Sequence, residues 1–218
     1  MLTRIDSVTI GAADLASGIA AYRRIGFDVG KDGVARMERD HIELVAGREG
    51  IQTIALASDA LARDSRHGSA EYIRLVELKK SKDGSRHPNG VRRIERVYIA
   101  VTDLKSAMDK YTPVLGMRPK IERGTVIMAD MAIYQLGENG FGLAQPVAPG
   151  ICAEALARRG PGPFQILYRT SSMDACAKWM AGQGLPPPTR GIRNTGEQAM
   201  LVAPEHACGV YIGFVGPA

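Results

Sequence analysis

The chain has 218 residues, of which 45% are hydrophobic and 23% are charged, and its formal net charge is +5. This composition supports a folded core and excludes a disordered chain, a collagen-like fibre and a disulfide-stapled miniprotein. No run of about 18 apolar residues occurs, so we expect no association with a membrane. The first residues lack the basic-then-apolar layout of a signal peptide, and we therefore expect a soluble, cytoplasmic protein.

The positive charge and the cysteines give no sign of a nucleic-acid or zinc site. The densest basic stretch, at residues 79–86, is short and has no interleaved aromatic residues, so we expect no nucleic-acid partner. Cys152, Cys176 and Cys208 lie far apart and form no Cys-x-x-Cys pair, which is typical of a reducing compartment.

The chain opens with an alternating stretch that predicts a β-strand, with Val8 and Ile10 on one face and small polar residues on the other. Asp14 is then placed to cap a helix of about 11 residues, which has apolar residues at helical spacing. Two short strands are predicted after it, at residues 34–38 and 41–46.

The same order of features returns in the second half of the chain. Residues 94–104 match residues 5–15 in register, which indicates an internal repeat. Each copy has a helix-capping aspartate and a helix-ending glycine: Asp14 and Gly26, then Asp103 and Gly116. Strands are predicted after the second helix at residues 125–136 and 141–145.

Two weaker copies begin near residues 51 and 163, so four units are predicted, each of β-α-β-β-β order, with the second unit shortened. The fold class is therefore α+β, with paired βαβββ units forming two domains that have open, cup-shaped sheets. We place the domains at residues 1–85 and 90–218. The Pro- and Gly-rich segment 148–162 is expected to be a linker between the last two units.

The repeated strand-and-helix openings at residues 8–15 and 97–104 resemble those of the vicinal oxygen chelate superfamily. The turn at 87–90 and the closing stretch at 203–212 also look like its glyoxalase-like branch. That superfamily includes glyoxalases, extradiol dioxygenases and bleomycin-resistance proteins. The resemblance implies two domains of paired βαβββ units that bind a small molecule, and it does not define the reaction.

The resemblance also implies places for metal ligands, a histidine in the first strand of a unit and a glutamate in its last strand. The histidine places hold Ser7, Thr53, Arg96 and Gln165, and the glutamate places hold Glu43, Arg74, Gly142 and Gly213. Arginine repels a cation, and only Glu43 keeps the expected type. We therefore predict no cofactor. If a divalent metal is present, we expect His41 and Glu43, which share a strand face, to bind it.

The same strand positions supply the candidates for chemistry on a ligand. Arg96 is predicted to bind a carboxylate or enolate, or instead to neutralise Glu122 or Asp130. The candidate catalytic residues are Arg96, Tyr98 and His206. The candidate substrate-binding residues are Gln165, Arg169, Tyr211, Tyr134 and Arg74.

Three functions remain open on the sequence alone. The first is a metal-independent lyase, isomerase or ring-modifying enzyme that acts on a small aromatic or carboxylated compound. The second is a non-catalytic protein that sequesters a drug or another small molecule, as resistance proteins do. The third is a dioxygenase or glyoxalase with relocated metal ligands. Each is compatible with a homodimer.

Overall fold

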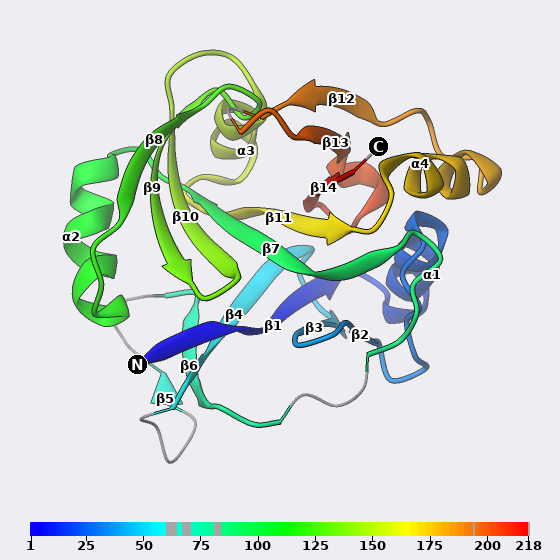
Figure 1. Cartoon of the computed structure of the whole chain (residues 1–218), viewed down its shortest axis with the longest axis horizontal. Helices are drawn as coiled ribbons and strands as arrows, with labels where there is room; N and C mark the ends of the chain where they lie inside the picture. The colour runs from blue at the N-terminus through cyan, green and yellow to red at the C-terminus, as the bar shows by residue number, and fades with distance from the viewer. Residues whose placement is uncertain (60–64, 67–70, 81–83, 194, 218) are drawn as a thin grey trace.

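The computed structural model describes residues 1–59, 65–66, 71–80, 84–193 and 195–217, and its strands form two sheets (Figure 1). The first sheet has the order β2-β3-β1-β4-β6-β5. Its strands are β1 (Leu2–Ala12), β2 (Val34–Arg36), β3 (His41–Ala46), β4 (Gly50–Ser58), β5 (Ser65–Arg66) and β6 (Ile73–Glu77).

The second sheet is larger and follows the order β12-β13-β14-β11-β7-β10-β9-β8. Its strands are β7 (Val91–Ala100), β8 (Lys120–Gly124), β9 (Ala129–Leu136), β10 (Asn139–Pro146), β11 (Gly162–Thr170), β12 (Thr189–Ile192), β13 (Gln198–Val202) and β14 (Tyr211–Gly216). Together the two sheets form the mixed α+β fold of paired units that the sequence predicts.

The fourfold repeat appears in the strand pairing. In each unit the first strand pairs in parallel with the last, namely β1 with β3, β4 with β6, β7 with β10 and β11 with β14. After its helix the first unit has the two strands predicted at residues 34–38 and 41–46, and it lacks the third strand of the β-α-β-β-β order. The difference arises because residues 30–34 close a tight turn, in which Gly33 donates to the carbonyl of Gly30 and Gly30 donates to that of Val34.

Three helices follow the first strands of their units, and their predicted caps are confirmed. These helices are α1 (Leu15–Ile25), α2 (Leu104–Leu115) and α4 (Met173–Gly182). Asp14 accepts a hydrogen bond from the Ser17 amide at 2.7 Å, and Asp103 accepts one from Ser106 at 3.0 Å. Gly26 ends α1 with a left-handed φ of 104°, as a glycine C-cap does.

None of the helices in the described part of the chain has the length and apolar run of a transmembrane segment.

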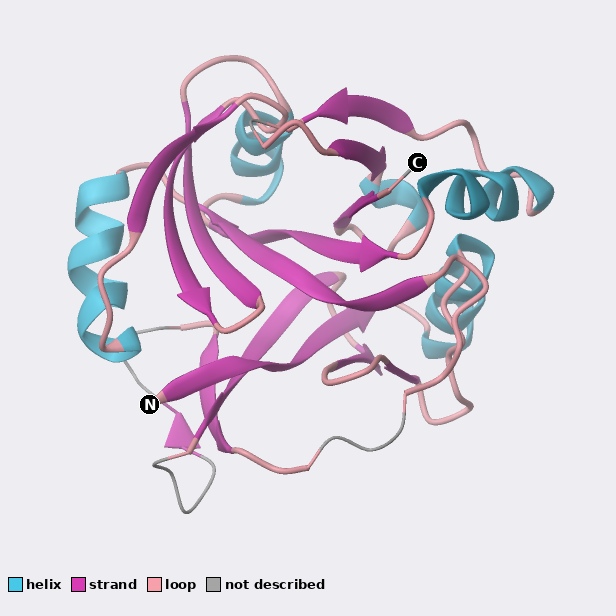
Figure 2. Cartoon of the chain, viewed as in Figure 1, coloured by secondary structure: helices cyan, strands magenta, loops and turns pink. Residues whose placement is uncertain are grey.

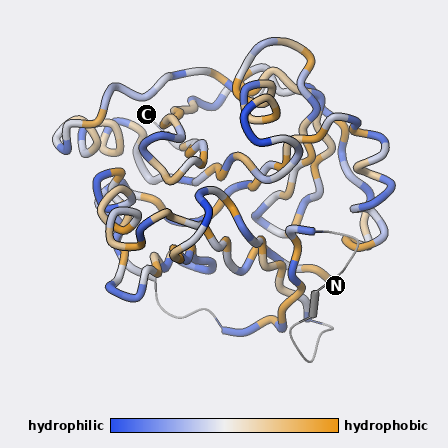
Figure 3. The backbone as a smooth tube through the Cα atoms, turned by 180° about the vertical axis from the view of Figure 1, so that it is seen from behind, coloured by the Kyte–Doolittle hydropathy of each residue, from blue (hydrophilic) through white to orange (hydrophobic). Residues whose placement is uncertain are grey.

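The convex faces of the two sheets share one hydrophobic core. Val8 and Ile10 of β1 and Val97 and Ile99 of β7 are all buried in it, and β1 contacts β9 and β10 of the other sheet. Figure 2 shows α2 on one side of the strands and α1 with α4 on the other. Hydrophobic and hydrophilic residues alternate along the central strands, as seen from behind in Figure 3. Because the convex faces pack against each other in this core, the concave faces of the two sheets point away from each other.

The expected linker at 148–162 contains a fourth helix, α3 (Ile151–Arg159). Gly150 and Gly160 flank this helix, and they do not prevent it from forming. Cys152 and Ala155 lie on its buried side and join the apolar lining of the second concave face. The segment connects β10 to β11, as expected of a linker between the last two units, and its prolines and glycines lie on either side of the helix.

Candidate functional site

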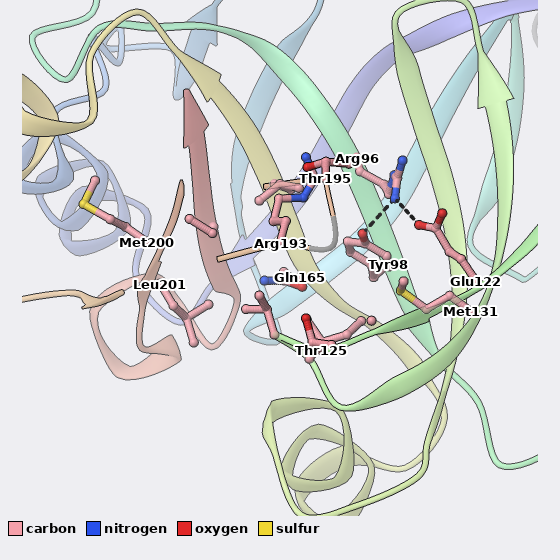
Figure 4. A pocket seen from close by; sticks show the side chains of 16 residues that line it. Arg96, Tyr98, Glu122, Thr125, Met131, Gln165, Arg193, Thr195, Met200 and Leu201 are labelled. Carbon is pink, nitrogen blue, oxygen red and sulfur yellow. Dashed lines mark hydrogen bonds and ion pairs between the residues drawn. The ribbon is translucent and has the colours of Figure 1, made fainter. Parts of the chain in front are cut away.

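A pocket of about 80 Å³ lies in the concave face of the second sheet (Figure 4). This volume is several times the ~10–15 Å³ that one water molecule needs, so a small organic group fits inside. The apolar walls come from strands and from the β8–β9 turn: Ile127, Met131, Leu167 and Leu201. The polar groups are Arg96, Tyr98, Gln165 and Arg193. An apolar pocket with a few convergent polar groups is typical of a ligand site.

Arg96 lies on β7, where strand alternation turns its side chain toward the pocket. Its Nη1 donates to the Tyr98 hydroxyl at 3.1 Å and to Glu122 Oε1 at 3.3 Å. Burial works against the charged form, but Tyr98 and Glu122 outweigh it and raise the pKa of Arg96, so the guanidinium stays charged. Its Nε is buried and has no hydrogen-bond partner among the described residues.

Gln165 on β11 is the second buried polar group with unused hydrogen-bonding capacity. Its side chain is 3% exposed, and Oε1 has no partner in the described structure. Gln165 pairs across the sheet with Tyr98, so both side chains lie on the same stretch of the pocket. Buried amides nearly always have partners, so an unpaired one facing a pocket indicates a place for a ligand or water.

Arg193 and Thr195 also line the pocket, although neither is among the residues predicted from the sequence. They lie in the turn between β12 and β13. Arg193 Nη1 donates to Glu197 Oε2 at 2.8 Å, and Thr195 donates to the same oxygen at 3.1 Å. The one available signal was the opposite charges of Arg193 and Glu197, which lie four residues apart across a hairpin turn.

Two of the other predicted substrate-binding residues lie near this pocket without lining it. Arg169 donates two hydrogen bonds to Glu95 and is also paired with Glu197. Tyr211 lies at the α3 end of the concave face, where its hydroxyl donates to Glu154 at 2.8 Å.

The structure does not bring the remaining candidates to the pocket. Tyr134 lies on the convex face, fully buried, and its hydroxyl pairs with that of Thr112 at 2.7 Å. His206 lies in the short 3₁₀-helix η1 (Pro204–His206), outside the pocket. Arg74 and His41 line a separate, polar cleft on the first sheet.

The superfamily metal positions do not suit a cation in the second sheet. A Cβ atom at Gly142 would lie 2.7 Å from a Tyr98 ring carbon, and one at Gly213 would lie 2.6 Å from Leu167. A carboxylate at either place would displace these side chains, the glycines themselves supply no ligand, and the charged Arg96 holds a third place. The described residues contain no cluster of three metal-ligating side chains, and Glu43 is exposed on the first sheet. Function without a metal stays a prediction.

The Arg96 side chain lies directly beside Gly140, and we expect the Gly140→Ala variant to displace the guanidinium of Arg96. A Cβ atom at residue 140 would lie 2.7 Å from Arg96 Nε, which belongs to the flexible end of the side chain. The fold should therefore persist while the guanidinium leaves Tyr98. A crystal structure of the variant should show a contact longer than the present 3.1 Å, and an unmoved Arg96 would contradict this expectation.

A family model described as the Glyoxalase/Bleomycin resistance protein/Dioxygenase superfamily matches residues 95–203. The chain therefore belongs to this superfamily. A search of curated proteins finds no significant match.

Solved structures agree with the fold. Methylmalonyl-CoA epimerase from Mycobacterium tuberculosis is similar at 27% identity over 59% of this chain and 90% of its own, with a TM-score of 0.53. The Streptomyces coelicolor epimerase, in complex with 2-nitronate-propionyl-CoA, shows 23% identity over 59% and 96%, with a TM-score of 0.51. A xylose isomerase-like TIM barrel/4-hydroxyphenylpyruvate dioxygenase fusion protein is similar in fold, with a TM-score of 0.68 and 13% identity. The matched region is 99% of this chain and 49% of the fusion protein.

Proposed function

We propose that the pocket of the second sheet binds a small carboxylated organic ligand, with Arg96 as the group that pairs with the carboxylate. The observation that carries this proposal is that two of the buried side-chain atoms without a partner in the described structure, Arg96 Nε and Gln165 Oε1, belong to residues that line this pocket. Leaving such groups unpaired costs about 1–3 kcal/mol each, and a ligand carboxylate that accepts from Arg96, with a water molecule that donates to Gln165, offsets that cost.

The chemistry of these groups favours a metal-independent lyase, isomerase or ring-modifying enzyme. Arg96 donates to the Tyr98 oxygen, so the phenolic proton is free to be donated to a ligand. Tyr98 is thus the candidate acid, and Arg96 stabilises negative charge that develops on a carboxylate or enolate. The similarity to an epimerase at 27% identity supports an isomerase among these enzymes.

A sequestering protein is the second candidate, and one observation favours it. Among the described lining residues there is no histidine, and Glu122, the one carboxylate, is held by Arg96 and Lys120. A general base is therefore not evident, and a protein that only binds its ligand needs none. Incubation with candidate acids, followed by NMR of the mixture, separates turnover from binding.

The binding proposal is tested by calorimetric titration with benzoate, phenylacetate and hexanoate. The Arg96→Gln variant should bind the best of these acids about 10- to 100-fold more weakly, because a charge-assisted hydrogen bond is lost. Arg92→Gln is the matched control, since Arg92 lies on the same strand but is exposed and paired with Glu38. Affinity in the presence of a chelator should not change. Equal binding by the Arg96→Gln variant would overturn the proposal.

A further inference from the structure

Two groups of charged side chains meet at the pocket, and in each the cations outnumber the carboxylates. In the first group Arg93 and Arg169 share Glu95, while Arg169 and Arg193 share Glu197. Three arginines thus face two glutamates.

The second group joins residues of β7 and β8, two strands that β10 and β9 separate in the sheet. Arg96 and Lys120 share the single carboxylate of Glu122, at 3.3 and 3.4 Å. The neighbouring pairs are balanced and point outward, as Arg123 pairs with Asp130 and Arg92 with Glu38. Each group therefore has one cation more than it has carboxylates, although Lys120 is 80% exposed and its charge is solvated.

Arg193 is the arginine of the first group that lines the pocket. Its side chain is 15% exposed, and only Nη1 bonds to Glu197, which Arg169 and Thr195 hold in place. Figure 4 shows Arg193 and Arg96 entering the same cavity from different elements, with Gln165 and Tyr98 beside them. A guanidinium has five N–H donors, so an arginine that uses one nitrogen on a neighbour keeps others for a ligand.

We infer that the ligand of this pocket carries two acidic groups, one paired with Arg96 and the other with Arg193, joined by an apolar body. This inference rests on the proposed function and specifies its substrate class as a dianionic organic acid. Arg96 and Arg193 are each held by one glutamate through Nη1 and keep other N–H donors, so a second acidic group adds charge-assisted hydrogen bonds that a monoacid lacks.

The test compares acids that differ only in the second carboxylate. Calorimetry on the full chain uses benzoate against phthalate, isophthalate and terephthalate, and hexanoate against adipate. At least one diacid should bind about tenfold more tightly than its monoacid, and its affinity should fall more steeply with added salt. The Arg193→Gln variant should reduce that ratio to about one, because the diacid loses the partner of its second carboxylate. Arg193→Lys, which keeps the charge, should retain part of the preference.

Arg190→Gln is the matched control, because Arg190 lies on β12 beside the turn but pairs outward with Asp174. It should leave every affinity unchanged. If each diacid binds with the same affinity as its monoacid, and Arg96→Gln weakens the binding of both, the inference is overturned while the proposed function stands. If none of the acids binds the unmodified protein, the proposed function fails, and the inference fails with it.

Discussion

Replacing Asp40 with asparagine should remove a loss of stability that the unmodified protein shows as the pH rises. Asp40 is 4% exposed, and burial raises its pKa from 3.8 to about 7. The Ile94 amide and Asn139 donate to its carboxylate, and Arg93 and Arg4 lie close enough to favour the charge, but burial outweighs them. The folded protein therefore binds this proton more tightly than the unfolded chain does.

The direction in which the free energy of unfolding changes with pH follows from this difference in proton binding. Between pH 3.8 and about 7 the unfolded chain has lost the proton and the folded protein keeps it, so the free energy of unfolding falls as the pH rises. A pKa difference of about three units corresponds to about 4 kcal/mol across this range.

The measurement is urea unfolding of both proteins from pH 4 to pH 8. Other carboxylates titrate in the same way in each protein, so their contributions cancel in the difference. The Asp40→Asn variant should gain up to about 4 kcal/mol relative to the unmodified protein between these limits. If the difference in free energy of unfolding between the two proteins does not change with pH, the Asp40 carboxyl stays ionised beside its two amide donors.

The Gly11→Ala variant should be strongly destabilised. Gly11 lies near the end of β1, between β3 and β4, where a Cβ atom would come within 1.9 Å of the Arg48 carbonyl oxygen and 2.9 Å of Gln52 Nε2. The closest atom belongs to the backbone and cannot rotate away, so the turn between β3 and β4 must move. We expect a loss of about 3 kcal/mol, which in a chain of this size lowers the Tm by about 6–12 °C.

Gly182→Ala supplies the control for this prediction. No atom lies within 4 Å of a Cβ built at Gly182, which is the last residue of α4. Because alanine favours a helix more than glycine does, this variant should be unchanged or more stable by up to about 1 kcal/mol. Thermal unfolding of the two variants side by side tests the argument, and equal melting temperatures would contradict it.

Local features of the sequence were sufficient to predict the strand faces and the helix ends. Val8 and Ile10 are buried as expected, and Asp14 caps its helix. Alternation and capping depend on residues a few positions apart, so they can be recognised without knowledge of the fold.

The site was harder to predict because it depends on distant pairings and on exact strand boundaries. The predicted strand 125–136 is interrupted by a turn that includes Met128 at a φ of 52°, and β9 starts at Ala129. In β9 alternation places Met131 toward the pocket and Tyr134 toward the convex core. Arg193 lies in a turn that carries no strand pattern, and its opposite charge to Glu197 does not by itself place it in the pocket.

The back-to-back arrangement of the sheets explains why the internal repeat is visible while the ligand positions differ. The matching residues, such as Val8 with Val97 and Ile10 with Ile99, lie in the shared core and must suit both sheets at once. Side chains on a concave face contact only their own cavity, so one unit can hold Ser7 where another holds Arg96 at no cost to the common core. A duplicated gene that folds in this way can diversify two binding surfaces independently, while a single buried layer preserves the record of their common origin.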